Sequence, residues 1–100
     1  GDAKAKEYAH TTQVAMETCS TENSTGSYTG CDLTALRAIE PTIPTTGVEA
    51  TVGTPTKGYT ITTTGSAGKF SIVRSESGAI SFTCNEKGKG GCPSSGNWGE

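Results

Sequence analysis

The clearest chemistry in this 100-residue chain belongs to four cysteines, Cys19, Cys31, Cys84 and Cys92. Four cysteines in so short a chain either hold a metal ion or form disulfides. No pair has the C-x-x-C spacing of a zinc site, and His10 is the only histidine. We therefore expect four oxidised cysteines, an oxidising compartment, and neither a bound metal nor a cofactor.

The pairing of the cysteines is open at this stage, because four cysteines allow three connectivities and the sequence alone does not choose among them. Loop length suggests Cys19–Cys31 and Cys84–Cys92, since each pair brackets a short polar loop. Residues 20–30 are mostly Ser, Thr, Asn and Gly. A bond across them would fix this loop against the preceding segment.

The remaining polar residues do not predict an enzyme. His10 lacks an evident nucleophile, because the cysteines are expected to be oxidised and no signal singles out a serine. Glu7 and Glu17 are separated by about 15 Å on a helix, which is too far for the paired carboxylates of a glycosidase. We interpret all three as solvated side chains.

Three further motifs have ordinary interpretations. The glycine-rich run 87–91 does not connect a strand to a helix as a phosphate-binding loop does, so we expect an exposed loop. Asn23-Ser-Thr25 matches the short N-glycosylation pattern, and we do not expect modification there. Trp98, the only tryptophan, is expected to pack the tail onto the sheet rather than to contact a neighbour.

Two helices are predicted in the first half of the chain. In residues 1–20, small and apolar side chains recur at steps of three and four and define one face; they are Ala5, Tyr8, Ala9, Thr12, Ala15, Met16 and Cys19. Residues 20–47 form a loop that contains a short helix, with Asp32 placed to cap it and Pro41 disfavouring its continuation.

The apolar period changes to two from Val48 onward, which predicts four short strands within residues 48–84. Glycine-containing turns at 53–55, 65–68 and 75–78 join them into an antiparallel meander. The first helix is the only sizeable cover for the apolar face of this sheet. The predicted fold class is therefore α+β, a helix on a four-stranded meander. We expect a mostly buried core of Tyr8, Ala15, Met16, Leu36, Ile39, Ile61, Ile72, Ile80 and Phe82.

Composition limits the partners. One hundred residues predict a single domain, 1–100, and a net charge of −2 with 18% charged residues indicates neither a nucleic-acid nor an acidic-lipid surface. No signal peptide or membrane-length apolar run is present in the sequence, although the cysteines imply export. We expect a processed or trimmed piece of a secreted protein, monomeric on its own.

The order of these elements resembles the type IV pilin family, especially pilins of Gram-positive, actinobacterial type. The resemblance covers almost the whole chain: the small-residue helix from Ala3 to Cys19, Gly26-Ser-Tyr-Thr-Gly-Cys31, Gly58-Tyr-Thr-Ile, Phe70-Ser-Ile-Val-Arg74 and Gly91-Cys-Pro-Ser-Ser-Gly-Asn-Trp98. It implies that residues 1–20 are the soluble half of a longer helix and that 85–100 are a disulfide-tethered C-terminal loop. The family's cleavage site and apolar helix are absent from this sequence.

The resemblance implies a structural subunit of an extracellular type IV pilus fibre at the cell surface, with roles in adhesion, motility or DNA uptake. Its partners would be other pilin subunits, met through the absent apolar helix, and the pilus assembly machinery. Membrane contact would also require that helix. One alternative is a pseudopilin of a type II secretion or competence system. Another, of a different class, is a small secreted binding module stapled by disulfides.

Overall fold

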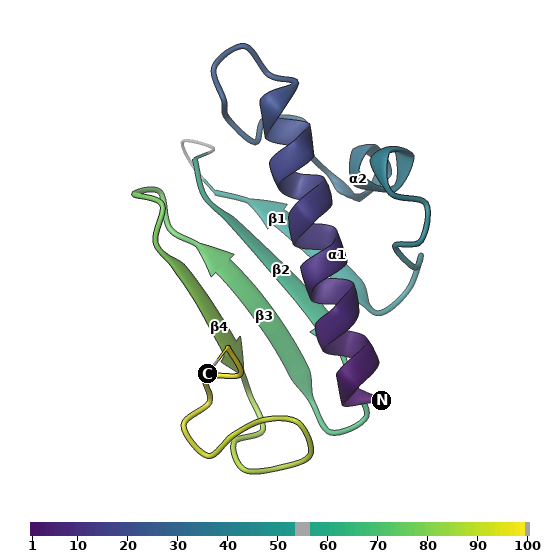
Figure 1. Ribbon diagram of the computed structural model, residues 1–100, viewed down its shortest axis with the longest axis vertical. Coiled ribbons are helices and arrows are strands. Elements are labelled where there is room, and N and C mark those ends of the chain that lie inside the picture. The colour runs from purple at the N-terminus through teal and green to yellow at the C-terminus, as the bar shows by residue number, and fades with distance from the viewer. Residues whose placement is uncertain (54–56, 100) are drawn as a thin grey trace.

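The computed structural model describes residues 1–53 and 57–99. Two helices precede four strands, and the long helix lies lengthwise across one face of a twisted sheet (Figure 1). The elements are α1 (Asp2–Thr21), α2 (Leu33–Ile39), β1 (Val48–Val52), β2 (Tyr59–Thr64), β3 (Lys69–Arg74) and β4 (Ile80–Cys84). The α+β arrangement predicted from the change of apolar period is therefore confirmed.

Helix α1 buries the predicted stripe of small side chains. Its buried residues are Ala5, Ala9, Thr12, Ala15, Met16, Cys19 and Ser20. Alanines on this face let the sheet approach the helix backbone, and the hydroxyl of Thr63 on β2 donates to the carbonyl of Ala5 at 2.8 Å. Thr12, also buried, donates to the Tyr8 carbonyl one turn earlier, at 2.7 Å. Both buried hydroxyls are thus paired, as burial in a core requires.

The sheet is an antiparallel meander in the order β1-β2-β3-β4. Ile61 on β2 pairs with Ala50 on β1 and with Ile72 on β3, and Ile72 pairs with Phe82 on β4. Because side chains alternate between the faces of a strand, this register places the apolar positions of all four strands on one side. That side meets α1, mainly over β2 and β3.

Two other segments extend the cover beyond α1. Helix α2 contacts α1 and contributes Leu36, which is fully buried, and the segment after it contributes Ile43. At the other side, Trp98 is 8% exposed, and its indole N–H donates to the backbone carbonyls of Ser71 and Thr83. The tryptophan thus packs the tail onto the sheet, as expected.

The prediction of a buried core is wrong for one residue, Ile80. Ile80 is 41% exposed, because it begins the edge strand β4, opposite Arg74 and away from the central strands that α1 covers. Tyr8, Ile39 and Phe82 are partly buried and pack against the core. The other five predicted core residues, Ala15, Met16, Leu36, Ile61 and Ile72, are buried.

The predicted helix signals act as expected. Asp32 is the N-cap of α2, and its carboxylate accepts from the Ala35 backbone N–H at 2.9 Å. Helix α2 ends at Ile39, two residues before Pro41. The turn expected at 53–55 lies partly outside the described residues. The other two turns connect β2 to β3 and β3 to β4.

Candidate functional site

Both disulfides join the pairs that loop length suggests. Cys19 at the end of α1 is bonded to Cys31, with Cα atoms 6.0 Å apart. Cys84 at the end of β4 is bonded to Cys92, with Cα atoms 5.8 Å apart. The first bond closes the polar loop after α1 and the second closes the turn after the sheet. These cysteines act as cross-links, and the described residues include no free cysteine.

A second anchor of the first loop is a carboxylate shared by two buried tyrosines. Tyr28, from the loop, and Tyr59, from β2, both donate their hydroxyls to Glu17 on α1, at 2.8 and 2.9 Å. Their rings meet edge to face at a centroid distance of 5.0 Å. Burial, reinforced by the adjacent Glu17 charge, raises the pKa of each tyrosine. Glu17 therefore joins the loop, the helix and the sheet.

The Asn23 side chain is used inside the same loop. Its amide nitrogen donates to the carbonyls of Ser27 and Thr29, at 2.7 and 3.0 Å. Glycosylation would attach a sugar to this nitrogen and would remove at least one of these donors. The structure therefore assigns Asn23 an internal role as the residue that organises the loop.

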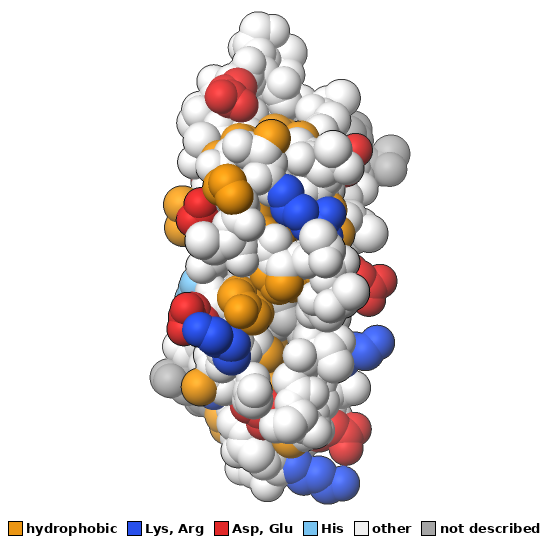
Figure 2. Space-filling model, turned by 90° about the vertical axis from the view of Figure 1, so that its right-hand side faces the viewer, with side chains coloured by type: hydrophobic (Ala, Val, Ile, Leu, Met, Phe, Trp, Pro, Cys, Tyr) orange, Lys and Arg blue, Asp and Glu red, His pale blue; other side chains and the backbone are white. Residues whose placement is uncertain are grey.

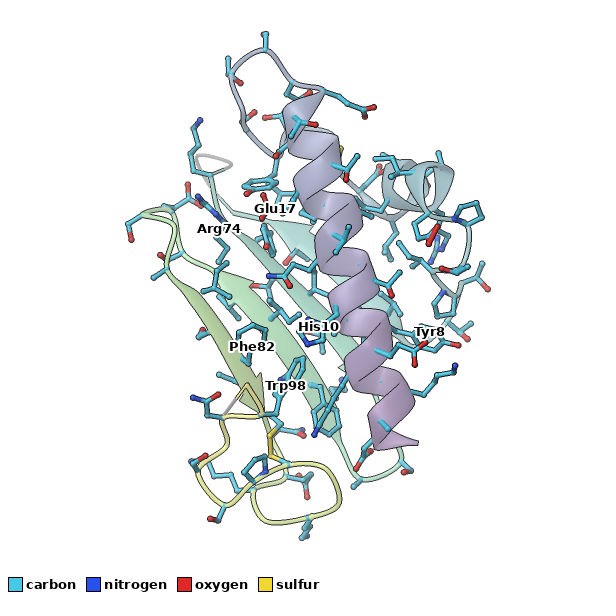
Figure 3. All side chains as sticks on the ribbon, in the orientation of Figure 1. Tyr8, His10, Glu17, Arg74, Phe82 and Trp98 are labelled. Carbon is cyan, nitrogen blue, oxygen red and sulfur yellow. A yellow bond between two sulfur atoms is a disulfide. The ribbon has the colours of Figure 1, made fainter. Side chains whose placement is uncertain are left out.

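His10 lies beside aromatic rings. Its ring is 5.3 Å from Trp98 and 5.8 Å from Phe82, measured between centroids, and the three residues gather between α1 and β4 in Figure 3. The imidazole is exposed on the surface of α1. Its ring contacts give it a packing role at the margin of the core. Among the described residues, no group of three or more His, Cys, Asp or Glu side chains is arranged to hold a metal ion.

The C-terminal loop has its own carboxylate anchor at the start of α1. Asp2 accepts from the backbone N–H of Gly91 at 2.9 Å and from that of Ala67 at 3.0 Å. These two hydrogen bonds lower the pKa of Asp2 below its usual value of 3.8. Gly90 sits against this carboxylate with a positive φ of 53°, and a side chain there would collide with Asp2. Asp2 thus ties α1, the β2–β3 turn and the C-terminal loop together.

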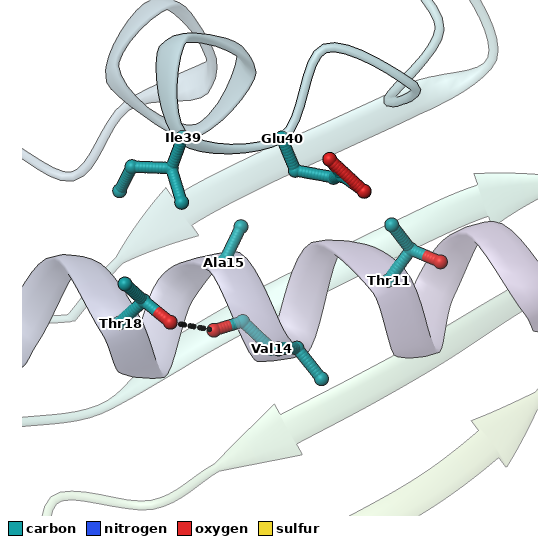
Figure 4. A pocket seen from close by; sticks show the side chains of 6 residues that line it. All are labelled: Thr11, Val14, Ala15, Thr18, Ile39 and Glu40. Carbon is teal, nitrogen blue, oxygen red and sulfur yellow. Dashed lines mark hydrogen bonds between the residues drawn. The ribbon is translucent and has the colours of Figure 1, made fainter.

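The part of the surface that most resembles a binding site lies along α1, on the side of the helix that faces away from the sheet. A shallow groove of about 320 Å³ runs between α1 and the end of α2, lined by Thr11, Val14, Ala15, Thr18, Ile39 and Glu40 (Figure 4). We call these six residues the α1 groove. Val14 is 66% exposed and also lines a second hollow with Gln13, Glu17, Thr18 and Thr21.

The α1 groove is weakly charged. Glu40 is its only ionisable lining residue, and Thr18 turns its hydroxyl back onto the Val14 carbonyl at 3.0 Å, which leaves its methyl group for contact. On the side of the molecule that Figure 2 presents, apolar side chains form separate patches, and charged side chains lie beside some of them. The groove itself, with one ionisable lining residue, suits contact with another apolar or small-residue surface better than recognition of a charged ligand.

The sequence interpretation did not single out Val14. Its position falls outside the buried stripe, three residues after Thr11 and four before Thr18, on the polar face of the helix. A large β-branched apolar residue on a polar face is a signal in itself, because such a side chain is left largely exposed, as Val14 is. That signal becomes interpretable only when the position of α2 shows that Val14 borders a groove.

Comparison of the chain with protein-family models, with curated proteins and with solved structures gave no match. In the part of the chain that the structure describes, no helix is long and apolar enough to span a membrane.

Proposed function

We propose that this chain is the soluble domain of a type IV pilin, a structural subunit of an extracellular fibre. The observation that carries the proposal is the position of α1. This helix of 20 residues lies lengthwise over an antiparallel meander, buries one face, and leaves an opposite strip with an exposed valine. A helix at the edge of its own fold, with one face free, is suited to pack against other subunits.

The anchoring of the polar loops supports a location outside the cell. Both loops contain few apolar residues, and both are closed by disulfides, which persist in oxidising environments. A fibre subunit exposed to proteases benefits from loops that do not open locally. In this proposal the α1 groove is covered by neighbouring subunits, and an apolar continuation of α1 upstream supplies the main force for assembly.

The decisive experiment reads the coding sequence upstream of Gly1 and follows the full product. A prepilin peptidase site followed by an apolar segment of about 20 residues is expected, together with cleavage by that peptidase. A full product that is soluble and uncleaved would overturn the proposal and favour the secreted binding module. A pseudopilin would share the cleavage site and differ in the machinery encoded beside it.

The α1 groove gives a second test. In assembling cells, Val14→Glu should reduce incorporation into fibres by placing a charge in a covered contact, whereas Glu7→Gln, an exposed change on the same helix, should not. Equal incorporation of both variants would show that the groove stays open to solvent. The isolated domain is expected to be a monomer at micromolar concentration without hydrolase activity, as sedimentation and substrate panels would show.

A further inference from the structure

The two edges of the sheet differ in whether another segment of the chain pairs with them. At the β4 edge, the Cys84 backbone N–H donates to the Gly96 carbonyl at 3.0 Å, and the Trp98 N–H donates to the Phe82 carbonyl at 3.2 Å. The C-terminal segment therefore occupies that edge. Strand β1 is the outermost strand on the other side. Uncovered edges are templates for pairing with another strand, and proteins usually block them.

The backbone hydrogen bonds next to β1 show which of its groups point outward. The Gly53 N–H donates to the Gly58 carbonyl at 2.9 Å, and the Thr64 N–H donates to the Gly47 carbonyl at 2.9 Å. The backbone N–H and C=O groups of the odd-numbered residues of this strand therefore point toward β2. Because bonded and non-bonded positions alternate in antiparallel pairs, the N–H and C=O groups of the even-numbered residues point away from the sheet. These residues are Val48, Ala50 and Val52.

No hydrogen bond within the described ranges, 1–53 and 57–99, joins these outward groups to another segment of the chain. Strand β1, with the sequence VEATV, contains neither proline nor lysine, and Glu49 is its only charged residue. Val48, Ala50 and Val52 pack toward the core, while Glu49 and Thr51 are exposed on the opposite face. The edge is therefore regular and open.

We propose that β1 pairs antiparallel with β1 of a second copy of this chain, centred on Ala50, so that the two sheets become continuous. In this register Ala50 faces its own copy and Val48 faces Val52, which brings together all the outward-pointing groups and allows about six backbone hydrogen bonds. The pairing is isologous, as a two-fold contact requires.

Charge selects this register over its neighbours. In the centred register Glu49 lies opposite Thr51 of the other copy. A shift of two residues in one direction places Glu49 directly opposite its own copy, and like charges in that position are destabilising. A shift in the other direction leaves Val48 unpaired. A shift of one residue would place outward-pointing backbone groups of one strand opposite inward-pointing groups of the other. It would also put the apolar side chains of the two copies on opposite faces of the joined sheet.

The pairing is intrinsically weak, which fits a monomer at micromolar concentration. Two strands of five residues bury less than the roughly 1,000 Å² of a stable interface. High local concentration compensates for this, because repeated copies on one scaffold convert weak contacts into avid ones. The proposal does not depend on the fibre: the free domain should pair at about millimolar concentration, where a contact of this size becomes populated.

Register-specific cross-linking tests the proposal. Glu49→Cys and Thr51→Cys are prepared separately with the native disulfides formed, then oxidised alone and as a mixture. The centred register brings residue 49 within about 4.5 Å of residue 51 of the other copy, measured between Cα atoms, but keeps identical residues beyond disulfide reach. The mixture should therefore cross-link on the order of tenfold faster than either variant alone.

A control and a second measurement complete the test. Thr51→Cys mixed with Ser81→Cys, an exposed position on β4, should show only the background rate. Ala50→Pro removes an outward N–H that no described residue uses, so the domain should fold, as circular dichroism would show, and remain a monomer at about 1 mM. Equal rates in all mixtures, a monomeric parent at that concentration, or an Ala50→Pro variant that still dimerises would each overturn the proposal.

Discussion

Met16→Ala is the sharpest test of whether α1 is the cover of the sheet. Met16 is fully buried in the layer between helix and strands. Truncation removes Cγ, Sδ and Cε, which loses roughly 2 kcal/mol of transfer free energy. The cavity left behind adds to this, and Met→Ala changes in cores typically cost about 2–5 kcal/mol. Val14→Ala on the same helix is the matched control, because Val14 is largely exposed.

Urea unfolding followed by circular dichroism, with the disulfides intact, measures both variants. Met16→Ala should lower the free energy of unfolding by about 2–5 kcal/mol. Val14→Ala should change it by less than about 0.5 kcal/mol, as surface substitutions usually do. A loss below about 1 kcal/mol for Met16→Ala would show that the helix and sheet do not share one core.

Three further changes test the anchors. Replacing Cys19 and Cys31 together by serine should cost roughly 3 kcal/mol through the lost closure of a dozen-residue loop; an unchanged urea midpoint would contradict this. Asp2→Asn should make the free energy of unfolding depend less on pH in acid. The lowered pKa of Asp2 stabilises the fold above about pH 4, and this contribution disappears as the pH falls through the pKa of Asp2 in the folded protein. Titration of the urea midpoint with pH measures this dependence. Tyr59→Phe should cost about 1 kcal/mol of stability at neutral pH. It should also make the free energy of unfolding less sensitive to pH above about pH 10, because burial raises the pKa of Tyr59 and the tyrosine of the unfolded chain ionises first. Equal slopes of the urea midpoint against alkaline pH in the two proteins would contradict this reasoning.

Periodicity in the sequence was sufficient to predict the elements of the fold. The step of three and four residues in α1, the Asp32 cap and the alternation from Val48 are local signals, and each element formed where its signal lies. The prediction that Ile80 is buried was wrong, because alternation indicates which face of the sheet a side chain lies on and not whether another element covers that face. Coverage depends on the position of α1 over β2 and β3, and that is a property of the assembled layers.

The candidate site was less predictable for the same reason. Glu17 was interpreted as a solvated charge, yet two tyrosines from distant segments donate to it. Residues 17, 28 and 59 have no common periodicity, so only the folded chain brings them together. The α1 groove likewise depends on how α2 docks beside α1, because the groove lies between the two helices. Cysteine pairing was more accessible, because loop length constrains which bonds close a small polar segment.

The two polar loops are held by the same three kinds of anchor, although they lie at different ends of α1 (Figure 1). The first has the Cys19–Cys31 bond, the buried ring of Tyr28 and the Glu17 carboxylate.

The second loop has the Cys84–Cys92 bond, the buried ring of Trp98 and the Asp2 carboxylate. Each loop has too few apolar residues to bury itself, so a covalent bond limits its unfolded freedom, one aromatic ring supplies buried area, and one carboxylate on α1 fixes its orientation. Because both carboxylates belong to α1, displacement of this helix would release both loops at once. We therefore expect hydrogen exchange in the two loops to rise together in Met16→Ala, although Met16 is in neither loop. Independent changes in the two loops would show that each is stable without the helix.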